Sequence, residues 1–371
     1  MNSVQNPASR QPPSFEEAKN FRQKSRAAGL DPDRWYVVEY DNAVKKGQVK
    51  EVVFWNTSMA LYRGEDGQLA AVQNRCPHRQ LKLSHGAVEN CQLRCAYHGW
   101  SFNREGWLTD YSHDSFDKAL IKKQIRTYPV AVRYGLIWVF PGDAAKADQV
   151  AIPTIPELEG DAPWASVTAD FTWKSHHSMV IDNICDFAHA FLHRKYQPFT
   201  DAKLKHYESD ENRVFLSYDT FVGGGKISGM FIDRNRINTR SMNLCYEYPY
   251  QWSDTDGKIK NWCFVLPIDE RTTRAFFLFY FDSFIIPKTS LATPKWLTQA
   301  ILWIARPLLL KPLLAEDGIA LEAEQEGYDQ YWDAPPIELN PVVPLFQQLT
   351  ARKWEAHLQG LNKPKEILAE A

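Results

Sequence analysis

The sequence has little cysteine, with six residues among 371. Six unevenly spaced cysteines are too few for a disulfide framework in a chain of this length, so a reducing compartment is expected. An excess of charge of one sign is also lacking, because 43 lysines and arginines face 45 aspartates and glutamates. Without a long basic run the chain lacks the footprint of a phosphate-binding surface, and no nucleic-acid partner is expected.

Targeting and membrane-spanning segments are lacking too. Residues 1–28 are polar and hold no apolar segment before a small-residue cleavage site, which predicts a cytoplasmic protein. The longest apolar run, 296–314, is interrupted by Arg306, Pro307, Lys311 and Pro312. A spanning helix needs about 20 mostly apolar residues, so this run is not expected to span. It is either a helix packed on the fold or at a subunit interface, or an interfacial segment that gives peripheral membrane contact through 296–314.

Two short Cys/His pairs stand out against this background. Cys76 and His78 form a C-x-H pair, and Cys95 and His98 form a C-x2-H pair. Two thiolates on one iron and two imidazoles on the other are the ligands of a Rieske [2Fe–2S] centre, which suits a one-electron relay. Zinc also accepts Cys and His, but zinc sites favour Cys-x2-4-Cys followed by His-x3-5-His, and the order here differs.

A second polar constellation lies in the apolar stretch 180–193. Read as one helix, Asn183, Asp186, His189 and His193 fall at steps of three, three and four, so their side chains share one face. Two imidazoles one turn apart plus a distant carboxylate would make the facial triad of a non-haem Fe(II) oxygenase. The alternative is a pair of ordinary, partly buried histidines. The upstream His176 and His177, on a predicted strand, are not favoured as ligands.

Together these stretches resemble the Rieske-type non-haem iron oxygenases, specifically the catalytic (alpha) subunit of the single-chain homotrimeric kind. The first matches the C-x-H and C-x2-H signature, which continues here into Gly99-Trp100, and the second matches N-x2-D-x2-H-x3-4-H. The resemblance implies a role for each matched residue: Cys76, His78, Cys95 and His98 bind the [2Fe–2S] cluster, His189 and His193 bind mononuclear Fe(II), and Asp186 is the acid bridging the two centres. The segment 314–325 resembles the family's late helix, which makes Asp317 the third iron ligand, with Glu316 and Glu322 as alternatives.

The expected fold is α+β. Short β-rich runs broken by turns predict an all-β Rieske domain over 31–145, after an N-terminal arm over 1–30 that is loosely ordered or weakly helical. Proline-rich linker residues follow. Over 146–371 a helix, antiparallel strands and a long late helix are expected in that order. The resemblance implies that this part is a helix-grip catalytic domain, with substrate held between sheet and helix.

The resemblance also implies the activity, an oxygenase that oxidises its substrate with O2 at the iron, using electrons from the cluster. No G-x-G-x-x-G lies between a strand and a helix, so an external ferredoxin or reductase must donate the electrons. The family implies a head-to-tail homotrimer in which His98 of one subunit meets Asp186 of its neighbour. Abundant aromatic residues favour a large hydrophobic, ring-bearing substrate. Hydroxylation or oxidative demethylation is favoured over dihydroxylation. The alternative function is a Rieske electron-transfer or redox-sensing protein with a degenerate catalytic domain.

Overall fold

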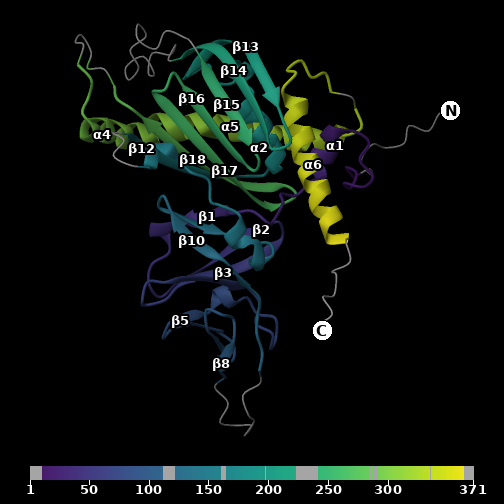
Figure 1. Cartoon of the computed structure of the whole chain (residues 1–371), viewed down its shortest axis with the longest axis vertical. Coiled ribbons are helices and arrows are strands. Elements are labelled where there is room, and N and C mark those ends of the chain that lie inside the picture. The colour runs from purple at the N-terminus through teal and green to yellow at the C-terminus, as the bar shows by residue number, and fades with distance from the viewer. Residues whose placement is uncertain are drawn as a thin grey trace, which may run out of the picture. The chain divides into compact units, whose positions relative to one another are not determined.

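The computed structural model describes residues 11–111, 122–159, 164–196, 198–222, 241–284, 286, 291–334 and 336–362. The chain divides into two compact units, one formed by Asp31–Thr154 and the other by Met1–Leu30 with Ile155–Ala371 (Figure 1). The first ten residues of the predicted arm and residues 363–371 of the predicted catalytic domain lie outside the described residues. All six cysteines are free thiols.

The first unit is built from three small antiparallel sheets. They have the strand orders β1-β11-β10, β2-β3-β4-β9 and β5-β6-β7-β8. The strands are β1 Tyr36–Tyr40, β2 Gln48–Phe54, β3 Thr57–Arg63, β4 Leu69–Gln73, β5 Ala87–Glu89, β6 Gln92–Arg94, β7 Ser101–Phe102, β8 Leu108–Asp110, β9 Thr127–Tyr128, β10 Val130–Arg133 and β11 Leu136–Val139. Gly67, with φ of +91°, lies in the turn between β3 and β4, where Asp66-Gly67 predicts a hairpin. The predicted all-β character is confirmed.

The second unit is built on a seven-stranded antiparallel sheet of order β12-β18-β17-β16-β15-β14-β13. Its strands are β12 Ala165–Trp173, β13 Phe199–Ser209, β14 Arg213–Val222, β15 Met242–Glu247, β16 Tyr250–Thr255, β17 Ile259–Asp269 and β18 Thr272–Phe281. Burial alternates along β12 and β16, as expected when one face of a sheet packs against other elements. The α+β prediction for this part of the chain is confirmed.

Helices of the second unit pack against this sheet or against one another. They are α1 Phe21–Ala27, α2 His177–Cys185, α4 Lys295–Ala305, α5 Lys311–Tyr331 and α6 Val343–Asn362, and a π-helical turn over Arg306–Leu310 joins α4 to α5. Short 3-10 helices cover Asp41–Ala43, Leu83–His85, Ala144–Gln149, Pro156–Leu158 and Phe187–Phe191. In Figure 1 the long α4–α5 helix runs across the sheet, and β12 contacts both of its parts.

The N-terminal arm belongs to the second unit. Helix α1 packs on α6, and it carries Arg26 into the interior. The Arg26 guanidinium donates to Ser178 Oγ at 2.7 Å, Asp182 Oδ2 at 2.8 Å and Glu324 Oε1 at 3.0 Å. Because these partners sit on α2 and α5, one arginine ties the arm to two central helices. The arm is therefore an ordered part of the fold from about residue 11 onward.

The prediction of one helix over 180–193 is wrong. Helix α2 ends at Cys185, and Asp186 adopts an extended conformation with φ of −100° and ψ of 101°. Its carboxylate accepts a hydrogen bond from Ala188 N at 2.8 Å and so caps the following 3-10 helix. Aspartate competes with helical hydrogen bonding in this way, which breaks the regular period. The prediction of a strand at His176 and His177 is also wrong, because these residues begin α2.

Candidate metal centres and substrate cavity

Two tight loops of the first unit bring the predicted cluster residues together. Cys76 and Cys95 are only 2% and 3% exposed. The rings of His78 and His98 have centroids 4.4 Å apart, and His78 stacks on Trp100 at 4.8 Å. Backbone hydrogen bonds fix each loop, for example from Gly99 N to Cys95 O at 3.1 Å. The four predicted side chains therefore lie close together.

This donor set fits an iron–sulfur cluster. Burial, with a smaller contribution from the nearby Cys95, raises the pKa of the Cys76 thiol to about 11. A buried thiol with a raised pKa stays protonated and is a poor nucleophile. Direct coordination by iron deprotonates such a thiol. His78 Nδ1 is buried without a hydrogen-bond partner in the described structure, as expected for a nitrogen that faces a metal.

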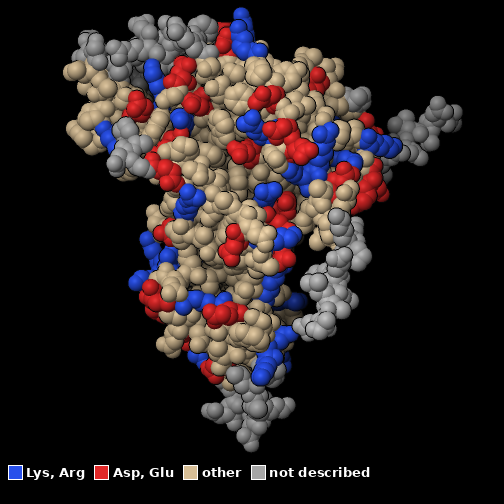
Figure 2. All heavy atoms as spheres, viewed as in Figure 1, with Lys and Arg blue, Asp and Glu red and all other residues tan. Residues whose placement is uncertain are grey.

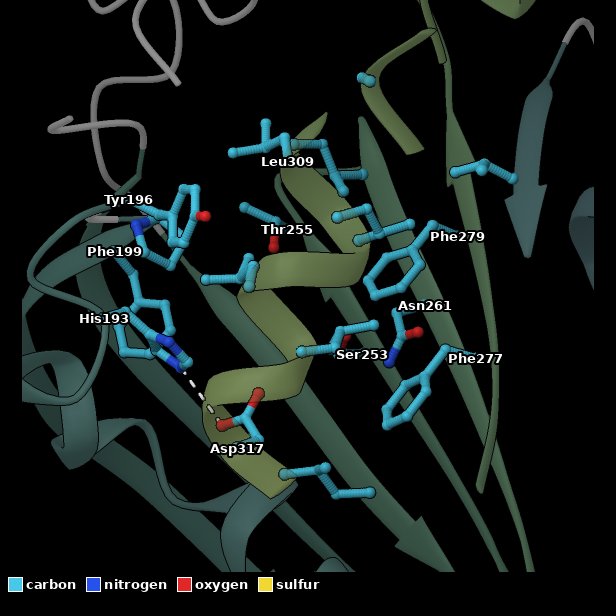
Figure 3. A pocket seen from close by; sticks show the side chains of 18 of the residues that line it. His193, Tyr196, Phe199, Ser253, Thr255, Asn261, Phe277, Phe279, Leu309 and Asp317 are labelled. Carbon is cyan, nitrogen blue, oxygen red and sulfur yellow. Dashed lines mark ion pairs between the residues drawn. The ribbon is translucent and has the colours of Figure 1, made fainter. Parts of the chain in front are cut away.

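The second centre lies in the other unit, where His189, His193 and Asp317 converge. Their ligand atoms all lie within 4.8 Å of one another. Asp317 Oδ1 is 3.2 Å from His193 Nε2 (Figure 3). It is 3.6 Å from His189 Nε2. The three residues come from the 3-10 helix, the turn after it and α5, so the convergence is tertiary. Two imidazoles and one carboxylate match the facial triad of non-haem iron sites.

The electrostatics of this centre are those of a cation site. Burial lowers the pKa of His189, with Asp317 acting in the opposite direction, so its imidazole is neutral and able to bind a metal. Burial also acts to lower the pKa of His193, but the nearby carboxylates of Asp317 and Glu316 outweigh it and raise the pKa. Asp317 Oδ1 is buried beside the two imidazoles, yet it makes no hydrogen bond of good geometry with any described residue. A divalent cation would satisfy all three groups together.

The alternative carboxylates for the third ligand point elsewhere. Glu316 Oε2 lies 3.0 Å from His193 Nδ1, on the ring nitrogen that faces away from Asp317. Glu322 accepts a hydrogen bond from Lys174 N at 3.0 Å. Glu316 is thus placed to orient the His193 imidazole, a role that the sequence reasoning did not assign to it. His176 and His177, which the sequence did not favour as ligands, do not belong to this group of converging side chains.

Asp186 is held beside this centre by a residue that the sequence reasoning missed. Asn340 Nδ2 donates to Asp186 Oδ1 at 3.0 Å and to Tyr218 Oη at 2.9 Å. Asn340 lies between α5 and α6, 154 residues from Asp186, and no local sequence pattern could have indicated the contact. The Asp186 carboxylate is therefore fixed at a defined position next to the iron-site 3-10 helix.

A mostly apolar cavity of about 260 Å³ opens at the triad. It lies between the sheet and the α4–α5 helix, as the close view in Figure 3 shows. Its wall includes Val167, Ile184, Phe187, Phe199, Met242, Ile259, Phe277, Phe279, Phe281, Phe284, Leu302, Leu309, Leu310, Leu313 and Leu314. Because a cavity with this mostly apolar lining favours hydrophobic ligands, the three converging side chains face an apolar binding space.

Comparisons with known proteins agree with this geometry. Residues 34–125 match the Rieske [2Fe-2S] domain, and residues 173–359 match the vanillate O-demethylase oxygenase C-terminal domain. The chain is 44% identical over 344 residues to a 4beta-methylsterol monooxygenase of Methylococcus capsulatus, an alignment that covers 92% of this chain and 93% of that protein. The chain belongs to the Rieske-type non-haem iron oxygenases.

Two further relatives share a lower sequence identity with the chain. This Rieske oxygenase is 33% identical over 161 residues to the oxygenase component of a dicamba O-demethylase from Stenotrophomonas maltophilia, covering 43% of this chain and 47% of that protein. A crystal structure of dicamba monooxygenase bound to dicamba has the same fold, with a TM-score of 0.70 at 21% identity, over 90% of this chain and 99% of that one. Membership assigns a Rieske cluster, a mononuclear iron and an oxygenase reaction to the protein.

Proposed function

We propose that this Rieske oxygenase oxidises a methyl group carried by a large, neutral, steroid-like ring system. The observation that carries the proposal is the apolar cavity whose wall includes His189, His193 and Asp317. The name of the 44% identical relative, a 4beta-methylsterol monooxygenase, supports a polycyclic substrate over a small aromatic acid. The reaction on such a substrate is hydroxylation, or oxidative demethylation by repeated hydroxylation, rather than cis-dihydroxylation.

In this proposal the predicted residues hold the two metal groups. Cys76, His78, Cys95 and His98 bind the cluster, and His189, His193 and Asp317 bind the iron. The cluster and the iron supply one-electron transfer and oxygen activation when bound. The chain itself contributes an apolar wall that excludes bulk water, and the carboxylate of Glu316 orients His193 from behind. A degenerate catalytic domain would have no reason to keep the triad. The three side chains are present and converge, which argues against a protein that only carries electrons.

Electron delivery involves partners. We propose an external ferredoxin or reductase as donor, and a head-to-tail homotrimer in which His98 of one subunit meets Asp186 of the next. The fixed position of Asp186 supports this, since its carboxylate is held by Asn340 while also capping the iron-site 3-10 helix. An acid between a cluster imidazole and an iron-site imidazole would couple the protonation of one to the other.

The function is tested with anaerobically purified protein. We expect about three irons per chain, two in the cluster and one in the triad. With a reductase, O2 and a 4-methylated sterol, we expect a product heavier by one oxygen atom in mass spectrometry. The matched control is the same sterol without the 4-methyl group. Two irons per chain and no oxygenated product would leave only an electron carrier.

We further propose that the α4 segment contacts a membrane surface peripherally. Trp296 and Trp303 are 71% and 75% exposed, and Ile304 and Leu308 are also exposed. Leu302 and Leu309 of the same stretch line the cavity, so one short segment joins an exposed apolar surface to the cavity wall. From 283 to 315 the sequence has no Asp or Glu but has four basic residues. An apolar, basic segment favours an anionic lipid surface.

By length and composition alone, the helix Lys295–Tyr331 could cross a bilayer. Its C-terminal part carries Asp317 and packs on β12 and α2, so we propose surface contact and not spanning. Elsewhere, on the face shown in Figure 2, acidic and basic side chains are interspersed.

Co-sedimentation with vesicles of neutral and of anionic phospholipid tests the contact. Trp303→Gln with Trp296→Gln should reduce binding to anionic vesicles, and Leu361→Gln on the exposed end of α6 should not. Equal binding to anionic vesicles by the wild type, the double tryptophan variant and Leu361→Gln would rule out the membrane contact.

A further inference from the structure

The sheet places three neutral polar side chains in the apolar cavity wall. Ser253 and Thr255 lie on β16, and Asn261 lies on the neighbouring strand β17. Ser253 and Asn261 are direct partners in the strand register, and Thr255 lies two residues further along the same face. Figure 3 shows Ser253 and Asn261 side by side, projecting from the sheet toward the cavity opposite His193 and Asp317. We call these three residues the polar strip.

The carboxamide of the polar strip is not satisfied by the described residues. Asn261 Oδ1 is buried and has no hydrogen-bond partner in the described structure. Its neighbours Ser253 and Thr255 are only 8% and 7% exposed and belong to the same wall of the cavity. Leaving a buried polar group without a partner costs about 1–3 kcal/mol. An unsatisfied carboxamide beside two hydroxyl-bearing residues in an apolar wall is therefore placed to bind a polar group that enters the cavity.

The chemistry of the strip defines that partner. Hydroxyl and carboxamide groups both donate and accept, and rotation of the Asn261 carboxamide exchanges Oδ1 with Nδ2. None of the three carries charge. The charged residues that line the cavity are Asp317, in the iron triad, and Arg306, on the π-helical turn. A ligand carboxylate would find no cation at the strip, whereas a hydroxyl or ketone would find donors and acceptors.

We propose that the polar strip recognises a hydroxyl group of the substrate and thereby selects which carbon faces the iron. This inference rests on the proposed function, since it assumes a hydrophobic ring system in the same cavity. An apolar ring system in an apolar cavity has no strong preference among orientations, because hydrophobic contact is non-directional. One hydrogen-bonded end removes that freedom, so the strip sets both affinity and the position of oxidation.

The test compares two ligands on the holoenzyme without O2, a 4-methylated steroid alcohol and the same steroid lacking its hydroxyl. Binding is followed by quenching of tryptophan fluorescence. We expect the wild type to bind the alcohol about tenfold to a hundredfold more tightly than the deoxy compound. Asn261→Leu, nearly isosteric, should bring the two affinities within about threefold of each other. The deoxy compound should bind the variant as it binds the wild type, which also shows that the cavity is intact.

The outcomes separate the two proposals. Equal binding of both steroids by the wild type, or an unchanged preference in Asn261→Leu and in the triple variant with Ser253→Ala and Thr255→Val, would overturn the polar strip alone. Binding of neither steroid would overturn the substrate class and the strip with it. With O2 and a reductase added, Asn261→Leu should give a mixture of oxidised positions where the wild type gives one. A single unchanged product would also count against the strip.

Discussion

Glu316 Oε2 lies 3.0 Å from His193 Nδ1, while Asp317 Oδ1 lies 3.2 Å from Nε2 of the same imidazole. Two adjacent residues of α5 thus reach the two nitrogens of one ring. A carboxylate that holds one imidazole nitrogen while the other nitrogen faces the metal site fixes the tautomer and orientation of a metal-binding histidine. This relationship makes Glu316 testable separately from the proposed ligands.

We expect Glu316→Gln to weaken iron binding by roughly 10- to 100-fold, because the imidazole loses the carboxylate that orients it. The measurement is iron content after dialysis against a graded series of chelator concentrations, with cluster absorbance as internal reference. Glu326→Gln, an exposed position on the same helix, is the matched control. Iron retention equal to that of the control would show that Glu316 does not support the site.

Asp186→Asn should leave three irons per chain and reduce turnover by roughly 100-fold, since an amide keeps the shape but cannot couple two imidazoles by charge. Steady-state oxidation of substrate and single-turnover oxidation of the reduced cluster measure the effect. Asp219→Asn, at a half-buried position where the carboxylate pairs with Lys205, serves as control. Wild-type rates in Asp186→Asn would remove this residue from the proposed relay.

Gly318 follows Asp317 on α5 and packs directly against Trp173. A Cβ at this position would lie 2.3 Å from Trp173 Nε1 and 2.7 Å from Cδ1. Gly318→Ala should therefore lower the free energy of unfolding by about 1–3 kcal/mol and displace the neighbouring Asp317, with loss of iron. Gly327→Ala on the same helix, where nothing lies within 4 Å, should instead stabilise by about 0.5–1 kcal/mol. Urea denaturation of both variants checks the opposite signs, and equal effects would contradict the packing argument.

His177 makes stability depend on pH. Burial lowers its pKa to about 4, and its Nε2 donates to Ala28 O at 2.7 Å. The unfolded chain binds the proton near pH 6.5 and the folded chain only near 4, so this contribution is fully present above pH 6.5 and is lost as the pH falls toward 4. The loss approaches about 3 kcal/mol at the bottom of this window.

Burial also lowers the pKa of the adjacent His176, which adds to the loss in acid. Thermal unfolding between pH 7.5 and 4.5 measures the effect. His177→Gln should be less stable at pH 7.5 but show a shallower pH dependence, whereas the exposed His206→Gln should follow the wild type. Parallel curves for His177→Gln and the wild type would exclude His177 as the titrating group.

The sequence was most informative where chemistry depends on local spacing. The C-x-H and C-x2-H pairs each place one thiol and one imidazole on a short loop, so the pattern alone indicated four residues that the fold brings close together. The choice among Glu316, Asp317 and Glu322 was harder, because it depends on the rotation of α5 about its axis. Only packing, such as that of Gly318 on Trp173, sets that rotation.

Other features had no sequence signal of their own. The helical period over 180–193 suggested one helix, but Asp186 uses its side chain as a cap and divides the stretch in two. The pattern nevertheless indicated two histidines that converge with Asp317 in the structure, because a turn and a helix can both bring residues four apart together. The contact of Asn340 with Asp186 and the assignment of the arm to the second unit depend on pairs more than 150 residues apart.

Arg26 makes the first thirty residues necessary for the stability of the second unit. Removing them would leave Asp182 deep in the interior with Gln347 as a neutral neighbour and no cation. A lone interior carboxylate is far costlier than a lost surface contact. A shortened chain that begins at the cluster domain should therefore fail as an iron protein even though every proposed ligand is still encoded. Proteolytic removal of the arm would inactivate the oxygenase even though the cleavage removes no proposed metal ligand.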